Sequence, residues 1–347
     1  MPTRHLFLVL LLTVTAIACA PTEDQAVTTD QAPPTMDLFK EASLRFAPLP
    51  SAAPNPDNPV TEAKIELGKK LYYDTRLSKD GNISCNSCHD LATFGVDLKP
   101  TSEGDDGSFG DRNSPTVLNA ALHQTQFWDG RAMDVEEQAG MPILNPVEMA
   151  IPNEEFLVDR LAASDDYPPL FTQAFPEEAK PLVYANISRA LGAFERTLLT
   201  PSRFDAYLEG DQEALNRQEK AGLEKFIQLG CTTCHNGVNV GAYSFQKFGL
   251  FGDYWEHTGS EKIDEGRFTV TENEADKFVF RVASLRNVAE TGPYFHDGSV
   301  ESLKEAIRIM VKLQLAIELR DDEVENLAAF LRSLSGEVPV EALQSAG

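Results

Sequence analysis

The sequence predicts a mainly α-helical protein of two domains with long irregular loops. Five stretches carry apolar residues at helical spacing, namely 61–73, 182–199, 216–229, 300–317 and 322–334. Alternating runs typical of strands are scarce, and Gly and Pro punctuate two long segments at 100–116 and 236–274. One cysteine motif occurs in each half of a chain of 347 residues, a length that suits two ordinary domains.

The N-terminus has the layout of a secretory signal. Arg4 and His5 precede an apolar run at 6–18, which is shorter than the about 20 residues that span a bilayer. The run ends in Ala16-Ile17-Ala18-Cys19, which resembles a bacterial lipobox whose cysteine is lipidated. The box usually has Leu where Ala16 stands, and the same residues also suit ordinary signal cleavage. We expect a bacterial periplasmic protein with 1–19 as its signal and Cys19 as a lipid-bearing membrane tether.

The rest of the chain divides by composition. Residues 20–38 are rich in Pro, Thr, Asp and Gln and predict a flexible tether. We expect one domain at 39–201 and a second at 202–347, whose last helix packs back on the first. With 54 acidic and 30 basic residues the net charge is −24, which argues against nucleic acid and favours a basic or neutral protein partner. Solubility alone explains such a charge equally well.

Four of the five cysteines form two identical arrangements, Cys85-Asn86-Ser87-Cys88-His89 and Cys231-Thr232-Thr233-Cys234-His235. Two disulfides, or a zinc site made of two Cys-x-x-Cys pairs, are the alternatives. The histidine directly after each pair favours c-type haem attachment, in which the two thiols bond one haem edge and the imidazole lies under the iron. The sequence therefore predicts two covalently bound haem c groups.

The helical stretches follow the same division. The first precedes Cys85 and has Gly68 four residues before Tyr72; the third precedes Cys231 and has Gly222 four residues before Phe226. This weak repeat supports two similar domains. The stretch at 182–199 predicts a helix packed on the first domain. The last stretch carries a single apolar stripe, Leu327, Phe330, Leu331 and Leu334.

Several motifs together resemble the bacterial dihaem cytochrome c peroxidase family. They read Arg112-Asn113-Ser114-Pro115-Thr116-Val117-Leu118-Asn119, Gln126-Phe127-Trp128-Asp129-Gly130-Arg131, Asn145-Pro146-Val147-Glu148-Met149, Ser284-Leu285-Arg286-Asn287-Val288 and Pro293-Tyr294-Phe295-His296-Asp297-Gly298. The likeness extends from about Leu67 to Ile317. It implies an enzyme that reduces hydrogen peroxide to water with electrons from a small cytochrome c or a cupredoxin, which enter at the C-terminal haem.

The resemblance also implies the iron ligands. His89 matches the proximal ligand of the peroxide-binding haem, and His235 matches that of the electron-transfer haem. Met310 matches the second ligand of the latter, where a thioether raises the reduction potential. The alternative for Met310 is a residue that fills a helix core. The methylamine dehydrogenase maturation enzymes of the same superfamily have Tyr at this place, so Met310 favours a peroxidase.

Three further residues match the family's catalytic apparatus. Glu148 matches the glutamate that moves protons between the peroxide oxygens, and Gln138 matches an amide that orients peroxide. Trp128 matches an aromatic residue between the haems and predicts an electron relay. The alternatives are solvated loop residues for Glu148 and Gln138, and a packing residue for Trp128.

The family also binds one calcium ion between its domains. The matching donors here are the Asn113 side chain and the backbone carbonyls of Thr291 and Pro293, which are oxygen ligands suited to a hard cation. Family members are commonly homodimers, and the resemblance implies the same here.

One residue departs from the family pattern. Many members rest with a second histidine on the iron of the peroxide-binding haem, carried on a Gly-rich loop, and release it only after the other haem is reduced. Asp105 stands in that position, within Gly104-Asp105-Asp106-Gly107. A carboxylate is a poor substitute for imidazole, so we expect activity without prior reduction.

Two other functions stay open at this point. One is a long-range oxidase that modifies residues of a partner protein. The other is a dihaem electron carrier without catalysis, in which Glu148 and Gln138 have no chemical role.

Overall fold

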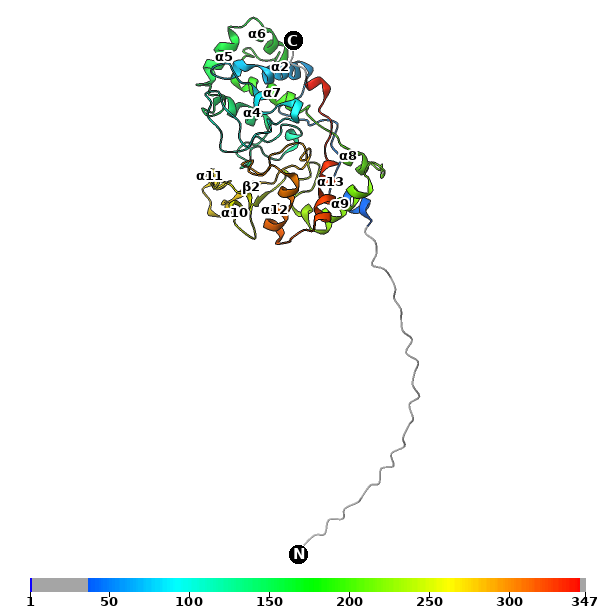
Figure 1. Ribbon diagram of the computed structural model, residues 1–347. Helices are drawn as coiled ribbons and strands as arrows, with labels where there is room; N and C mark the ends of the chain where they lie inside the picture. Colours follow the sequence, from blue (N-terminus) through cyan, green and yellow to red (C-terminus); the bar gives the residue numbers. More distant parts are fainter. Residues whose placement is uncertain (2–36, 344–347) are drawn as a thin grey trace. The chain divides into compact units, whose positions relative to one another are not determined.

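The computed structural model describes residue 1 and residues 37–343 (Figure 1). The predicted signal at 1–19, Cys19 and nearly all of the tether at 20–38 lie outside the described residues. From Asp37 onward the described chain forms one compact unit. Within this part, no helix has both the length and the apolar character that crossing a membrane requires.

The first half of the unit is built from short helices. Their bounds are α1 Leu38–Ser43, α2 Glu62–Tyr73, α3 Cys85–Cys88, α4 Val135–Leu144, α5 Glu154–Ala162, α6 Tyr167–Ala174 and α7 Tyr184–Glu195. Helix α2 begins where the Thr61 side chain accepts a hydrogen bond from the Lys64 amide, at 3.3 Å. Helix α7 packs against α2, α4 and α5. The core between them contains Leu67, Leu71 and Phe194, which are almost fully buried.

The second half has a similar plan. Its helices are α8 Arg203–Leu208, α9 Arg217–Gln228, α10 Tyr254–Thr258, α11 Phe268–Thr271, α12 Leu303–Leu315 and α13 Asp321–Arg332. Helix α13 packs against α9 and α12. Its predicted stripe is buried, which explains the apolar spacing of that stretch. In Figure 1, α9, α12 and α13 lie together in one half of the unit, away from α2, α5, α6 and α7.

Strands contribute little, and the prediction of a mainly α protein is confirmed. The described sheet consists of β1 Phe245–Lys247 and β2 Val279–Arg281, which pair antiparallel with Phe245 opposite Arg281. Strand β1 and the short helices α10 and α11 lie in the segment 236–274, which the sequence analysis treats as loop. The segment 100–116 contains no helix and no named strand.

The end of the described chain returns to the first half. The Tyr73 hydroxyl donates to the backbone oxygen of Ala342 at 2.8 Å, and Lys69 donates to that of Glu341. Ala342 is buried in the same core as α2 and α7. The last predicted helix, α13, itself packs on α9, so the contact with the first half is made by residues that follow α13. The predicted boundary between 201 and 202 stays a prediction.

The weak glycine repeat marks two close helix crossings. A Cβ atom on Gly68 would come within 1.9 Å of the Ala190 backbone oxygen in α7, and one on Gly222 within 1.9 Å of the Asn326 backbone oxygen in α13. The aromatic residue four positions later packs on the same partner helix in each half, since Tyr72 contacts Phe194 and Phe226 contacts Phe330. Only glycine permits these helix backbones to approach so closely.

We expect Gly222→Ala to lower the free energy of unfolding by about 1–3 kcal/mol, because the added methyl group must push α9 away from α13. Urea unfolding of the haem-loaded protein measures this change. Gln228→Ala is the matched control, since Gln228 is exposed on the same helix and its loss should cost at most about 0.5 kcal/mol. Equal effects of the two substitutions would contradict the close crossing.

Candidate functional site

The two cysteine motifs adopt the same local geometry. The His89 amide donates to the Cys85 backbone oxygen at 2.9 Å, and the His235 amide donates to that of Cys231 at 2.9 Å. This turn brings the two sulfurs and the imidazole of each motif to neighbouring positions, as attachment of a haem requires. All four cysteines are free, so the disulfide alternative is wrong for them. In the described part, no group of three or more His, Cys, Asp or Glu side chains could hold a metal ion, which removes the zinc alternative.

A large cavity opens beside His89. It has a volume of about 1130 Å³, above the roughly 300–1,000 Å³ typical of cofactor sites. Trp128, Gln138 and Glu148 line it together with His89, so the structure gathers these predicted residues at one place. Cys85 and Cys88 line an adjoining cavity that shares His89 and Glu148 with the first. Burial lowers the pKa of His89, which keeps its imidazole in the neutral form that ligates iron. These residues fit a covalently bound haem.

Glu148 is held by the turn that follows α4. Its amide donates to the Asn145 backbone oxygen at 3.0 Å, and the Asn145 side chain donates to Glu148 Oε1 at 2.7 Å. Burial raises the pKa of Glu148, opposed by the Asn145 hydrogen bond and the charge of Arg131. A carboxyl whose pKa moves up toward working pH is suited to taking up and returning a proton. Gln138 reaches the same cavity from α4.

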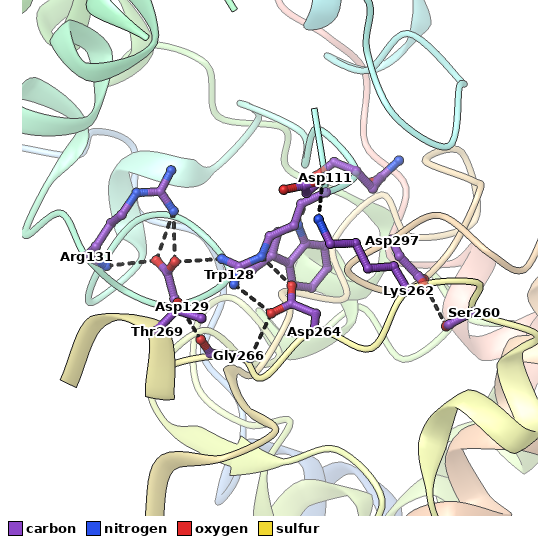
Figure 2. A network of polar contacts seen from close by, with 12 residues as sticks. Asp111, Trp128, Asp129, Arg131, Ser260, Lys262, Asp264, Gly266, Thr269 and Asp297 are labelled. Carbon is purple, nitrogen blue, oxygen red and sulfur yellow. Dashed lines mark hydrogen bonds and ion pairs between the residues drawn. The ribbon is translucent and has the colours of Figure 1, made fainter. Parts of the chain in front are cut away.

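Trp128 lies between the two halves of the site. Its indole Nε1 donates to the Asn113 backbone oxygen at 2.9 Å. It lines the His89 cavity, and it also packs against the apolar cluster of the second half, on which Met310 packs too. Figure 2 shows the polar network around it, in which Asp129 accepts hydrogen bonds from Arg131. This position suits an electron relay between the two motifs.

The second predicted haem site is centred on His235. His235 Nδ1 lies 3.3 Å from the Val240 backbone oxygen, and its ring packs near Phe226. Burial lowers the pKa of His235 to about 4, so this imidazole is neutral too. Met310 is half-buried on α12, where it packs against the cluster of Phe248 and Tyr254. Its ligation to iron stays a prediction.

The carboxylate of Asp105 is held by a backbone amide. The Asp80 amide donates to both of its oxygens, at 3.1 and 3.2 Å. The Asp105 amide donates to the Glu148 backbone oxygen at 2.7 Å, which connects the Gly-rich loop to the turn that carries Glu148. Asp105 is buried and is not among the residues that line the cavity. This geometry agrees with the expectation that Asp105 does not replace the family's histidine ligand.

The predicted calcium donors lie on adjacent segments. The Asn113 amide donates to the His296 backbone oxygen at 2.8 Å, beside the segment that carries Thr291 and Pro293. The Asn113 side-chain nitrogen donates to the Lys99 backbone oxygen at 3.0 Å. Among the described residues, none donates a hydrogen bond to the backbone oxygens of Thr291 or Pro293. The calcium ion itself stays a prediction.

Several polar residues that line the His89 cavity were not predicted as site residues, among them His123, Glu195 and Arg281. Glu195 offers the clearest sequence signal, because it is a charged residue in the otherwise apolar stretch Ala193-Phe194-Glu195. It is only 5% exposed. Burial and the nearby Glu136 raise the pKa of Glu195 from 4.5 to about 8.

We expect Glu195→Gln to stabilise the protein at pH 8 by on the order of 3 kcal/mol. The unfolded chain releases the Glu195 proton near pH 4.5, while the folded chain keeps it until about pH 8. Ionisation therefore favours unfolding, and its cost grows as the pH rises through this range. Urea unfolding between pH 4.5 and 8 should show the advantage of the variant vanish at the acid end. An advantage that does not change with pH would contradict the raised pKa.

The chain is similar to known dihaem enzymes. Residues 62–213 match the family model described as di-haem cytochrome c peroxidase. A cytochrome c551 peroxidase of Pseudomonas aeruginosa is 46% identical over 304 residues, which cover 87% of both chains. A cytochrome c551 peroxidase of Nitrosomonas europaea is 43% identical and covers 87% of this chain and 89% of its own.

A solved structure gives the same likeness in three dimensions. It is the crystal structure of a MauG-like protein associated with microbial copper homeostasis, and it superimposes with a TM-score of 0.76 at 31% identity. The match covers 86% of this chain and 97% of that one.

Proposed function

The chain belongs to the di-haem cytochrome c peroxidase family, and we infer from this that it carries two haem c groups and reduces hydrogen peroxide to water with electrons from a donor protein. The observation that carries this function is the shared cavity, which His89, Glu148, Gln138 and Trp128 line together. A plain electron carrier would not need a half-buried carboxyl of raised pKa at this place.

We propose that each motif holds one haem. Cys85 and Cys88 bond the first, with His89 as the proximal ligand of its iron. Cys231 and Cys234 bond the second, with His235 and Met310 as axial ligands, and the thioether gives this haem the higher potential. When bound, the first haem supplies the iron at which peroxide is reduced. The domains that carry them are proposed at 39–201 and 202–347.

Glu148 is proposed to move the proton that the reaction requires. Cleavage of the O–O bond consumes two electrons and two protons and yields two waters. The Glu148 carboxylate takes a proton from one peroxide oxygen and returns it to the other, which leaves as water. Gln138 orients peroxide by donating a hydrogen bond from its amide. The Asn145 hydrogen bond to Glu148 Oε1 fixes the carboxyl and leaves the other oxygen for this work.

Electrons are proposed to enter at the second haem and to pass Trp128. The indole lines the His89 cavity and packs against the apolar cluster on which Met310 also packs, which supports this route. Because Asp105 is bonded to the Asp80 amide, it leaves the first haem open, and the oxidised protein accepts peroxide without prior reduction.

We propose one calcium ion held by the Asn113 side chain and the carbonyls of Thr291 and Pro293. The Thr291 and Pro293 carbonyls accept no hydrogen bond from the described residues, and the Asn113 amide donates to His296 three residues after Pro293, which supports this. The ion would brace the backbone oxygen of Asn113 that accepts from Trp128. We further propose that the protein is periplasmic, is tethered to a membrane through a lipid on Cys19 and works as a homodimer. The signal-like residues 1–19 support its export.

A direct test supplies reduced donors to the haem-loaded protein. We expect a small reduced cytochrome c or cupredoxin to be oxidised catalytically, at two donor molecules per peroxide. The second candidate function is long-range oxidation of a partner protein, the alternative that the sequence leaves open. Peroxide consumption that leaves both donors reduced would exclude the peroxidase function and support this alternative.

A further inference from the structure

Arg281 is a buried cation without a carboxylate partner. It is 4% exposed, and strand β2 fixes it through a hydrogen bond from its amide to the Trp128 backbone oxygen at 2.7 Å. Its Nε donates to the Phe127 backbone oxygen at 3.1 Å and its Nη1 to that of Val282 at 3.5 Å. No ion pair of the described part includes Arg281. A buried guanidinium bonded only to neutral carbonyls is costly unless an anion joins it.

Neighbouring acids do not supply that anion. Asp129 is the acidic residue whose charge acts on Arg281, but its carboxylate is already paired with Arg112 at 2.6 Å and Arg131 at 2.9 Å. The other cations that line the cavity are paired as well, as Figure 2 shows for Lys262 with Asp111. Burial lowers the pKa of Arg281 to about 10, which reflects the missing partner.

His123 lies at the same part of the cavity with both ring nitrogens unsatisfied. Nδ1 and Nε2 are buried and have no hydrogen-bond partner among the described residues. Burial, followed by the charge of Arg281, keeps the pKa of His123 well below its usual range, although the neighbouring Gln126 side chain raises it. Its imidazole is therefore neutral and carries one N–H that can donate. Arg281 and His123 thus both offer donors to a cavity that also contains His89.

We propose that Arg281 and His123 bind one propionate of the haem attached at Cys85 and Cys88. The inference rests on the proposed function, because that haem brings the anion into the cavity. A propionate accepts charge-assisted hydrogen bonds from the guanidinium and a further one from the imidazole. The His123 N–H, which has no partner among the described residues, then has an acceptor.

This pairing makes Arg281 a positioning residue that also tunes the first haem. A cation beside the propionate favours the iron state with less positive charge, so it raises the reduction potential of that haem. Removal of the cation should lower this potential and leave the second haem unchanged.

The test is a spectroelectrochemical titration of the haem-loaded protein that resolves the two haems. We expect Arg281→Gln to shift the midpoint potential of the His89 haem downward, with a smaller shift for Arg281→Lys and none at the other haem. Arg160→Gln is the matched control, because the Arg160 guanidinium also donates only to backbone oxygens but lies outside the cavity. A His89-haem potential equal to that of the control, or a shift confined to the other haem, overturns the proposal.

Resonance Raman spectroscopy of the propionate bending bands gives a second readout, which does not depend on Arg281→Gln accumulating. We expect His123→Phe to shift one propionate band. Unchanged bands in both His123→Phe and Arg281→Lys overturn the proposal. If variant protein carries two haems and turns over peroxide but shows unchanged bands and potentials, the propionate assignment is wrong and the proposed function stands. If the unmodified protein never binds haem at Cys85, both the propionate assignment and the proposed function are wrong.

Discussion

Replacing Glu148 with Gln is expected to lower kcat for peroxide reduction by about 10²–10⁴, the range that a positioned general acid–base group contributes. Gln keeps the shape of the side chain and its contact with Asn145, but it cannot take up a proton. The KM for peroxide should change far less than kcat, because the loss falls on O–O cleavage. Steady-state assays with a reduced donor protein measure both constants.

Glu155→Gln is the control for this substitution. Glu155 is exposed in the first turn of α5 and does not line the cavity, so its loss removes a carboxylate without touching the site. We expect its kcat to equal that of the unmodified protein. If Glu148→Gln and Glu155→Gln had the same kcat, Glu148 would have no part in catalysis.

Replacing Met310 with Leu is expected to lower the potential of the second haem and to slow donor-driven turnover. Axial ligands set haem potentials over a wide range, and a fall of about 120 mV disfavours one-electron entry about 100-fold. A potential titration and a donor assay measure the two effects. The far-red absorption band of a thioether-ligated ferric haem should vanish with them.

Met133→Leu is the matched control, because Met133 is exposed and lies outside the apolar cluster of the second half. Retention of the far-red band and of the potential in Met310→Leu would show that Met310 only fills the core of α12.

The parts of the fold that could be predicted are those with a local cause. Periodic apolar residues indicate α2, α7, α9, α12 and α13. Each Cys-x-x-Cys-His motif could also be recognised, because its geometry is set by a turn within the motif itself. Helices α4 and α6 were missed because proline obscures them: Pro142 lies inside α4, and α6 has proline in its first turn. The glycine repeat was visible in the sequence, but its cause was not. Gly68 and Gly222 are each in close contact with the backbone of a partner helix that lies far away in the chain.

The same distinction holds at the site. Glu148 could be proposed because a family motif surrounds it, and Gln138 because it lies ten residues before Glu148; the structure brings both to the His89 cavity. Arg281 and His123 carry no such motif. They share a cavity only because strand β2 lies beside the Trp128 backbone, a contact between residues far apart in the chain. The position of Asp105 likewise depends on the Asp80 amide, which its sequence neighbours do not predict.

The most direct test of a peroxidase already open at its first haem is rapid mixing of the air-oxidised, haem-loaded protein with one equivalent of peroxide, followed by haem absorbance. We predict a fast spectral change that is lost or strongly slowed in Glu148→Gln. An unmodified protein that stays silent until its second haem is reduced would contradict both the open site and the role of Asp105.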